Sequence, residues 1–260
     1  MRLPFKFLFL MGAVLVASPL AADAQEKVTV ATEASFPPFS KTEADGSFTG
    51  FEIDLGNEVC KRAKLDCEWV KQDFDGMIAA LIARKFNMVF SSMSIKPERE
   101  KVADFSIPYY AGKFVFYGKK GAFKNFDEDI KGKRVGVYAG ATQDQYVRKY
   151  HAGVLEPVGY ENADQIHADL VNGRIDLAFG EQQPAIEFMN SPQGKDFEQA
   201  GPLIDDPEVL GRGVGAMFNK GDALKAKVDE AIRNVYADGT FDKLQAKWLA
   251  GANIRADQLW

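Results

Sequence analysis

Short apolar runs alternate with amphipathic segments along this chain of 260 residues, and that alternation limits the fold more than any other feature. An apolar run predicts a strand buried on both faces, and an amphipathic segment predicts a helix packed on a core. Strands separated by helices are typical of α/β folds with mostly parallel sheets. The predicted strands lie at residues 28–31, 68–71, 88–91, 114–117, 134–138, 175–179 and 214–218. The predicted helices lie at residues 52–64, 74–84, 142–150, 163–172, 181–189, 224–237 and 240–249. The length fits one large domain or two lobes.

Residues 1–24 have the pattern of a cleaved secretory signal peptide. Arg2 and Lys6 precede an apolar stretch at residues 7–16, and the small residues Ala22 and Ala24 fit a cleavage site. The stretch is too short to cross a bilayer, so we expect export and not a retained anchor. Cleavage would leave 236 residues (260 − 24) with a formal charge of −6 (30 basic minus 36 acidic residues) in place of −5.

Cys60 and Cys67 are the only cysteines. In an exported chain a closely spaced pair is expected to form a disulfide, which in so short a loop contributes about 2–3 kcal/mol. A metal site is the rival interpretation, but the only histidines, His151 and His167, have no metal-type spacing to other donors, so we expect no metal and no cofactor. The same scarcity of histidine, without a Gly-x-Ser-x-Gly motif, disfavours a His-dependent hydrolase. The net negative charge without a basic stripe disfavours nucleic-acid binding.

A group of hydroxyls and one arginine follows the strand predicted at residues 88–91. Ser91, Ser92, Ser94 and Arg99 lie within nine residues of sequence. Hydroxyls and backbone N–H groups can hold one carboxylate oxygen while the planar guanidinium binds both. The alternative is an ordinary N-capped helix start with a solvated arginine. The segment alone leaves both interpretations open.

Other chemically distinctive residues follow predicted strands, where open α/β sheets bind their ligands. They are Glu33, Phe36, Phe74, Thr142 and Glu181. Each has a structural alternative: a solvated loop acid, two core aromatic residues, a helix cap and a first-turn acid. Taken together with Arg99, they suit an L-amino acid with a cationic side chain, because an arginine fits its carboxylate, an acid fits its ammonium group, and two aromatic rings form a flat slot beside a second acid.

The chain also resembles the periplasmic solute-binding proteins of amino-acid ABC importers, specifically the lysine/arginine/ornithine, histidine and arginine binders. The matching motifs run in order along the chain: residues 31–39 (ATEASFPPF), 50–55 (GFEIDL), 60–62 (CKR) with Cys67, 73–75 (DFD), 91–94 (SSMS), 97–99 (PER), 132–136 (GKRVG), 173–176 (GRID) and 238–240 (DGT). The resemblance implies a type II fold of two α/β lobes joined by two crossing strands, with the ligand between the lobes. Residues 25–111 and 212–260 would form lobe 1, and residues 112–211 would form lobe 2.

The resemblance also implies a role for each candidate. Arg99 would bind the α-carboxylate, helped by Ser94 and Thr142, and Glu181 would bind the α-ammonium group. Two sets of residues would surround the side chain: the aromatic pair Phe36 and Phe74, and the distal groups Glu33, Ser91 and Ser92. Cys60 and Cys67 match the disulfide of the family.

Five positions depart from the usual pattern of the family. Glu33 and Glu181 replace aspartates, Phe36 replaces a tyrosine, Ala141 replaces a serine, and Tyr138 is bulkier than the leucine of the lysine/arginine/ornithine binder. The longer acids shift each carboxylate about one methylene into the pocket, and Glu33 resembles the arginine-preferring relatives.

We therefore expect a monomeric, non-enzymatic periplasmic receptor. It would bind arginine, with ornithine, lysine and histidine as alternatives, and deliver it to an inner-membrane permease. The competing interpretations are a periplasmic dehydratase that acts on a small carboxylic acid, and a sensor of opines or other amino acids on the same scaffold.

Overall fold

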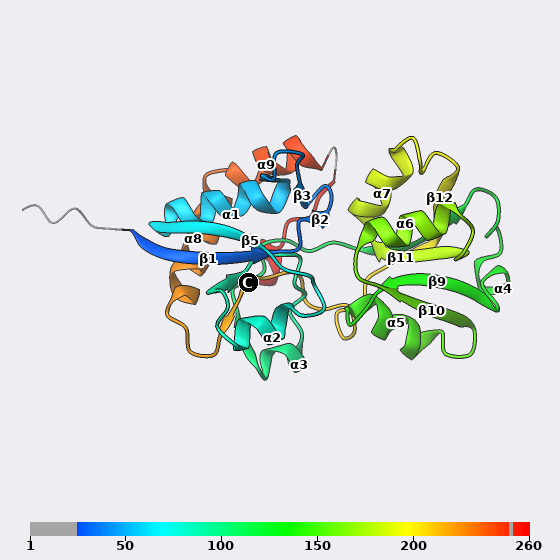
Figure 1. The fold of residues 1–260 in the computed structure, drawn as a ribbon, viewed down its shortest axis with the longest axis horizontal. Coiled ribbons are helices and arrows are strands. Elements are labelled where there is room, and N and C mark those ends of the chain that lie inside the picture. Colours follow the sequence, from blue (N-terminus) through cyan, green and yellow to red (C-terminus); the bar gives the residue numbers. More distant parts are fainter. Residues whose placement is uncertain (1–24, 250–251) are drawn as a thin grey trace, which may run out of the picture.

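A computed structural model describes residues 25–249 and 252–260, so the predicted signal peptide lies outside the described residues. The strands form two five-stranded sheets, which lie side by side along the long axis of the molecule (Figure 1). Their strand orders are β5-β1-β6-β13-β7 and β10-β9-β11-β8-β12, and β2 (Ser35–Phe36), β3 (Ser40–Thr42) and β4 (Phe48–Thr49) form a small third sheet. Within the described residues, no helix is both long and apolar enough to cross a membrane.

The first large sheet collects strands from both ends of the sequence. It contains β1 (Glu26–Thr32), β5 (Leu65–Lys71), β6 (Met88–Val89), β7 (Ala103–Phe105) and β13 (Met217–Asn219). Its helices are α1 (Phe51–Arg62), α2 (Met77–Ile82), α3 (Pro97–Glu100), α8 (Leu224–Ala237) and α9 (Thr240–Trp248). Figure 1 shows α1 and α9 on one side of β1 and β5, with α2 and α3 on the other side.

The second large sheet is built from one continuous stretch of sequence. It contains β8 (Phe114–Lys119), β9 (Lys133–Tyr138), β10 (Leu155–Tyr160), β11 (Leu177–Glu181) and β12 (Phe197–Ile204). Its helices are α4 (Phe126–Asp129), α5 (Thr142–Tyr150), α6 (Ala163–Val171) and α7 (Gln182–Asn190). In Figure 1, α6 and α7 cover one face of this sheet and α5 covers the opposite face.

The α/β class is confirmed, but the expectation of mostly parallel strands is wrong. Each large sheet has two parallel and two antiparallel pairings. The antiparallel pairings all involve β8 and β13, the strands through which the chain enters or returns from the second sheet. Sequence reasoning also missed β10 and β12, because both are half-buried edge strands interrupted by glycine and proline and so lack an apolar run.

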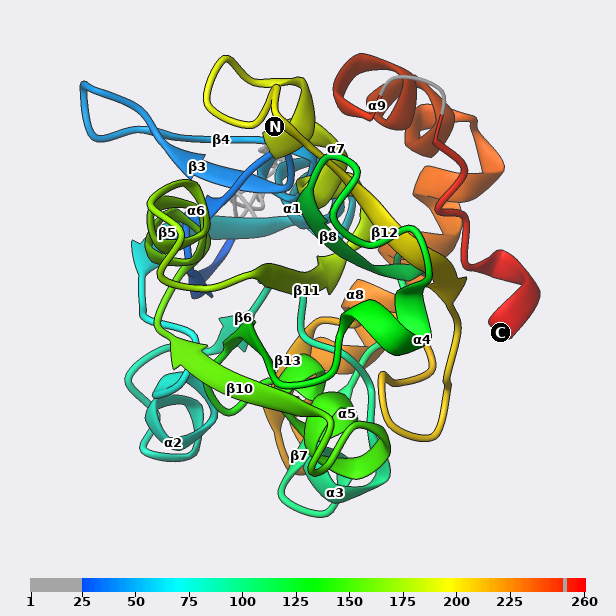
Figure 2. The same cartoon turned by 90° about the vertical axis from the view of Figure 1, so that its right-hand side faces the viewer.

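Two segments, residues 106–113 and 205–216, join the large sheets and pair with each other. The Tyr109 N–H donates to the Val214 carbonyl, and the Val214 N–H donates to the Tyr110 carbonyl, each at 2.8 Å. The C-terminal residues 252–260 lie against the first joining segment. The Ala111 N–H donates to the Ile254 carbonyl, and Trp260 Nε1 donates to the Pro108 carbonyl, each at 2.9 Å. Figure 2 shows this C-terminal end at one side of the molecule.

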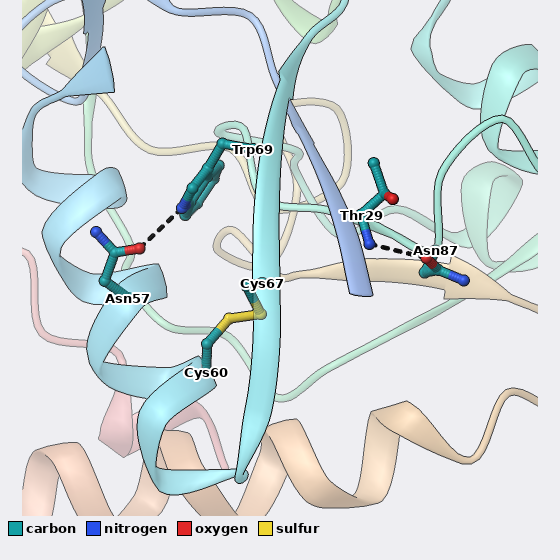
Figure 3. The surroundings of a disulfide bond; sticks show 6 residues. All are labelled: Thr29, Asn57, Cys60, Cys67, Trp69 and Asn87. Atoms are coloured by element: carbon teal, nitrogen blue, oxygen red, sulfur yellow. Dashed lines mark hydrogen bonds between the residues drawn. A yellow bond between two sulfur atoms is a disulfide. The ribbon is translucent and has the colours of Figure 1, made fainter. Parts of the chain in front are cut away.

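The predicted disulfide between Cys60 and Cys67 is confirmed (Figure 3). It links the last turn of α1 to β5, with the two Cα atoms 6.2 Å apart. The same two elements pack closely along their length, because a Cβ added at Gly56 of α1 would lie only 2.7 Å from the Trp69 indole of β5. Trp69 Nε1 also donates to Asn57 Oδ1 at 2.8 Å. The disulfide therefore reinforces a helix-to-strand contact that packing already defines.

Candidate functional site

Nine of the ten predicted site residues line one cavity between the two large sheets. From the first sheet and its loops come Glu33, Phe36, Phe74, Ser92, Ser94 and Arg99, and from the second come Tyr138, Ala141, Thr142, Gln143 and Glu181. Ser91 is not among the lining residues. Sequence reasoning did not single out Gln143, although its place beside Thr142 in the first turn of α5 is a signal that could have found it.

Arg99 brings a buried positive charge to one wall. It lies on the short helix α3, which begins at Pro97, and only 7% of its surface is exposed. Its Nη1 donates to the Ser94 carbonyl at 3.0 Å, a bond that uses one of the five guanidinium N–H donors. Burial lowers the pKa of Arg99 to about 10, so the side chain is still cationic at neutral pH. A desolvated cation whose other donors bond no side chain or carbonyl of residues 25–249 and 252–260 is suited to a carboxylate.

The N-terminus of α5 forms part of the opposite wall. Thr142 is the first residue of α5 and is buried. The preceding turn needs Gly140, whose φ is +70° and whose added Cβ would lie 2.7 Å from Asp75 Oδ1. Because Asp75 follows β5 of the first sheet, this turn holds the two sheets' loops in close approach. The first N–H groups of a helix lack partners within it, which favours an anionic group here.

Three aromatic rings meet in the cavity. Tyr138, at the end of β9, lies edge-on to Phe36, with ring centroids 5.7 Å apart and an interplanar angle of 90°. The Tyr138 ring also lies 6.3 Å from that of Phe74. Phe36 in turn stacks on Phe39 at 5.7 Å, which fixes the orientation of its ring. Tyr138 is thus the aromatic contact through which the second sheet meets both phenylalanines.

Glu33 provides a buried acid where the chain leaves β1. Only 4% of its surface is exposed, and burial raises the pKa of its carboxyl to about 7, although a hydrogen bond from Ser35 opposes that rise. Ser35 Oγ donates to Glu33 Oε1 at 2.9 Å, and the Glu33 N–H donates to Ser91 Oγ at 2.9 Å. Ser91 therefore contacts the backbone of Glu33 from outside the cavity.

Glu181 provides a second buried acid, at the junction of β11 and α7. The hydroxyl of Tyr110, in the first joining segment, lies within hydrogen-bond distance of Glu181 Oε2, at 3.0 Å. Burial, together with repulsion from the carboxylate of Glu52, raises the pKa of Glu181 to about 8, although the Tyr110 hydrogen bond opposes the rise. The acid is therefore costly to ionise until a positive group approaches it.

A third buried acid, Glu52, lies behind Ser92, and sequence reasoning missed its role. The Ser92 N–H and Oγ donate to Glu52 Oε1 at 2.7 Å and Oε2 at 3.0 Å. The signal in the sequence is an acid flanked by Phe51 and Ile53 in the first turn of α1, where both neighbours are buried.

The charges of the cavity define what it can hold. Arg99 is one fixed cation, and Glu33 and Glu181 are two acids that ionise when paired. A molecule with one carboxylate and two cationic groups would neutralise all three, whereas an unpaired buried charge is costly. Among the residues that the structure describes, no group of three or more His, Cys, Asp or Glu side chains is arranged to hold a metal ion.

The chain is similar to curated proteins and to solved structures of periplasmic binding proteins. The lysine/arginine/ornithine-binding periplasmic protein of Escherichia coli (strain K12) is 38% identical over 243 residues, which cover 92% of this chain and 93% of that protein. Among solved structures, a Salmonella typhimurium periplasmic binding protein described as highly specific for arginine has a TM-score of 0.81 at 31% identity, covering 86% of this chain and 100% of that chain. An ancestral amino-acid-binding protein, described as a precursor of cyclohexadienyl dehydratase, has a TM-score of 0.76 at 29% identity, covering 86% of this chain and 95% of that chain.

The likeness to the periplasmic binding protein structures confirms the predicted type II fold. Residues 28–251 match the bacterial extracellular solute-binding proteins, family 3. The resemblance inferred from the sequence motifs is therefore confirmed, and the chain belongs to family 3 of the bacterial extracellular solute-binding proteins.

Proposed function

We propose that this protein is a periplasmic receptor for a cationic L-amino acid, with arginine preferred, and that it delivers the amino acid to an inner-membrane ABC permease. The observation that carries the proposal is one cavity lined by a buried arginine, two buried acids and aromatic rings. These groups match the carboxylate, the two cationic groups and the aliphatic stem of such a ligand. The names of the relatives support the same ligand class.

Each wall has a proposed role. Arg99 binds the α-carboxylate, with Ser94 and the N-terminus of α5 at Thr142 beside it. Glu181 binds the α-ammonium group. Phe36 and Phe74 hold the side chain between them, and a cation over such rings is favoured by about 0.5–2 kcal/mol.

At the distal end, Glu33 pairs with the side-chain cation and Ser91 supports the backbone of Glu33. Ser92 and Tyr138 line the same cavity. Arginine is the preferred ligand because a planar guanidinium can stack on the aromatic rings while it pairs with a carboxylate, which a compact ammonium group does less well.

Ligand capture follows from the two joining segments. We assign residues 25–111 and 212–260 to lobe 1 and residues 112–211 to lobe 2. Rotation about the paired joining segments would close the lobes over the amino acid, as in other hinge-closing binding proteins. We further propose that residues 1–24 are a signal peptide removed on export, and that the mature receptor acts as a monomer.

The test is a ligand screen on residues 25–260. Arginine, lysine, ornithine, histidine, neutral amino acids and opines are compared by thermal shift, and hits are measured by calorimetry. A ligand at 100 times its dissociation constant stabilises the folded protein by about 2.7 kcal/mol. We expect the largest shift with arginine and none with neutral amino acids. No shift with any cationic amino acid would refute the proposal.

A second candidate function is a dehydratase that acts on a small carboxylic acid. The favouring observation is that the pKa values of Glu33 and Glu181 are raised to about 7 and about 8, in the range useful for general acid and base groups. The ancestral neighbour described as a dehydratase precursor points to the same chemistry. Turnover of a candidate acid such as arogenate, without a thermal shift from amino acids, would favour this alternative.

A further inference from the structure

A series of buried and half-buried polar groups connects Glu181, in the cavity, to Glu52 of α1. Tyr110 OH lies 3.0 Å from Glu181 Oε2 and 2.9 Å from Ser92 Oγ. Ser92 Oγ in turn donates to Glu52 Oε2 at 3.0 Å. Tyr109 donates its hydroxyl to the other carboxylate oxygen, Glu52 Oε1. We call Glu181, Tyr110, Ser92 and Glu52 the hydroxyl chain.

The hydroxyl chain is tied to the segments that would act as the hinge. Tyr110 lies in the first joining segment, where its backbone carbonyl accepts from the Val214 N–H of the second segment. Ser92 has a φ of +47°, a strained value for a residue other than glycine, and Glu52 accepts from its N–H at 2.7 Å. A carboxylate from α1 thus stabilises the backbone that presents Ser92 to Tyr110.

The number of protons limits which members of the hydroxyl chain can donate hydrogen bonds and which must accept them. Tyr110 has one hydroxyl proton and two oxygen neighbours, while the Ser92 proton is already directed to Glu52. If Glu181 is protonated, it can donate to the Tyr110 oxygen, and Tyr110 can donate to Ser92. If Glu181 is ionised, Tyr110 must turn its proton toward Glu181. The protonation of Glu181 therefore sets the direction of the Tyr110 hydroxyl.

We propose that Tyr110, Ser92 and Glu52 are positioning residues for Glu181, and that binding of the α-ammonium group reverses the Tyr110 hydrogen bond from Ser92 to Glu181. This inference rests on the proposed function, because it takes Glu181 as the ammonium-binding acid. In the reversal no covalent bond is made within the protein: Glu181 loses its proton to solvent, and the Tyr110 O–H rotates. Occupancy of the site is thereby communicated to a residue of the joining segment.

The charges around Glu181 agree with the two hydrogen-bond arrangements, one with Glu181 protonated and one with Glu181 ionised. The carboxylate of Glu52 repels that of Glu181. The negative charge of Glu181 in turn raises the pKa values of the phenols of Tyr109, Tyr110 and Tyr138. Arg99 and Glu33 line the same cavity as Glu181. Burial raises the pKa of Glu181 to about 8 and, less strongly, that of Glu52 to about 6. At pH 7 the hydroxyl chain therefore runs from a neutral Glu181 to an ionised Glu52, and a bound ammonium group releases the Glu181 proton.

The test measures proton release when arginine binds, by calorimetry in buffers of different ionisation enthalpy between pH 5.5 and 9. In the wild type, the number of protons that Glu181 releases on binding should fall to half near pH 8. The corresponding fall in proton release from Glu33 should lie lower, near pH 7. Tyr110→Phe removes the donor to Glu181, so this midpoint should move to higher pH and affinity should fall about tenfold. Glu52→Gln removes the repulsion, so the midpoint should move to lower pH.

Tyr110→Phe and Glu52→Gln should shift the pH midpoint of proton release in opposite directions. A general loss of packing would not do so, so opposite shifts distinguish a positioning role from a merely structural one. Tyr117→Phe is the matched control, since it deletes a buried hydroxyl that contacts His167 and not the cavity, and its profile should match the wild type. Wild-type midpoints in both variants, or shifts in the same direction, would overturn the inference. If Tyr110→Phe does not fold, Glu52→Gln alone decides it. Absence of arginine binding by the wild type would instead refute the proposed function.

Discussion

Replacing Arg99 by alanine should separate ligand affinity from the stability of the ligand-free protein. Arg99 is 7% exposed, and burial lowers its pKa from 12.5 to about 10. That shift corresponds to a cost on the order of 3 kcal/mol for holding the charge in the cavity, at 1.36 kcal/mol per pKa unit. Arg99→Ala should therefore leave the ligand-free protein as stable as the wild type or more stable.

The same substitution should strongly weaken binding. The carboxylate of a bound amino acid would be left desolvated and unpaired, which costs about 3–5 kcal/mol. At 1.4 kcal/mol per factor of ten, the dissociation constant for arginine should rise by about two to three and a half orders of magnitude. The matched control is Arg174→Ala, because Arg174 is an exposed residue between α6 and β11 that forms an ion pair with Asp169 and does not line the cavity, so affinity should not change.

The assay is isothermal calorimetry for affinity, with urea unfolding of both variants in the absence of ligand. Affinity within threefold of the wild type would refute the assignment of Arg99 to the carboxylate. A ligand-free protein destabilised by several kcal/mol would show that Arg99 has a structural role that its single bond to the Ser94 carbonyl does not reveal.

Three further predictions concern the acids and the disulfide. Glu33→Gln should weaken arginine and lysine binding by at least tenfold in the same calorimetric assay, because the side-chain cation loses its counter-ion. Unchanged arginine affinity would make Glu33 a structural loop acid. The pKa values of Glu33 and Glu181 are raised to about 7 and about 8 in the folded protein, so above pH 4.5 the folded state binds more protons than the unfolded state. These two groups should therefore lower the free energy of unfolding of the ligand-free protein as pH rises from 5 to 8.5, which urea unfolding can measure. A free energy of unfolding whose contribution from these groups rises with pH would contradict both pKa shifts. The double substitution Cys60→Ser with Cys67→Ser should lower the free energy of unfolding by about 2–3 kcal/mol. Arginine affinity should not change, because the disulfide links α1 to β5 and neither cysteine lines the cavity. A tenfold loss of arginine affinity would show that the disulfide also shapes the site.

The site was more predictable from sequence than the sheets were. Glu33, Arg99 and Glu181 each occur directly after or near a predicted strand, so a local pattern identifies them, and the cavity brings them together. Glu52 could not be assigned in the same way. Its partners are Ser92 and Tyr109, which are 40 and 57 residues away, and no local pattern encodes that contact.

The missed strands have a similar physical cause. β10 and β12 are edge strands that bury only part of their side chains, and β12 contains a glycine and a proline at positions 201 and 202. Such strands form because a neighbouring strand supplies the hydrogen bonds, which a pattern of apolar residues does not record. The antiparallel pairings depend on how the chain crosses between sheets, and that too is a long-range property.

The position of Trp260 gives this protein an intrinsic optical probe. The chain has three tryptophans: Trp69 is in β5, Trp248 ends α9, and Trp260 donates its indole N–H to the Pro108 carbonyl at the start of the first joining segment. The Trp260 ring also lies edge-on to Tyr236, with centroids 4.9 Å apart. Movement of the joining segment would change the polarity around this indole, so its fluorescence would report the proposed hinge rotation in real time without a dye. For the same reason, an affinity tag or a fused fluorescent protein belongs at residue 25 and not after Trp260.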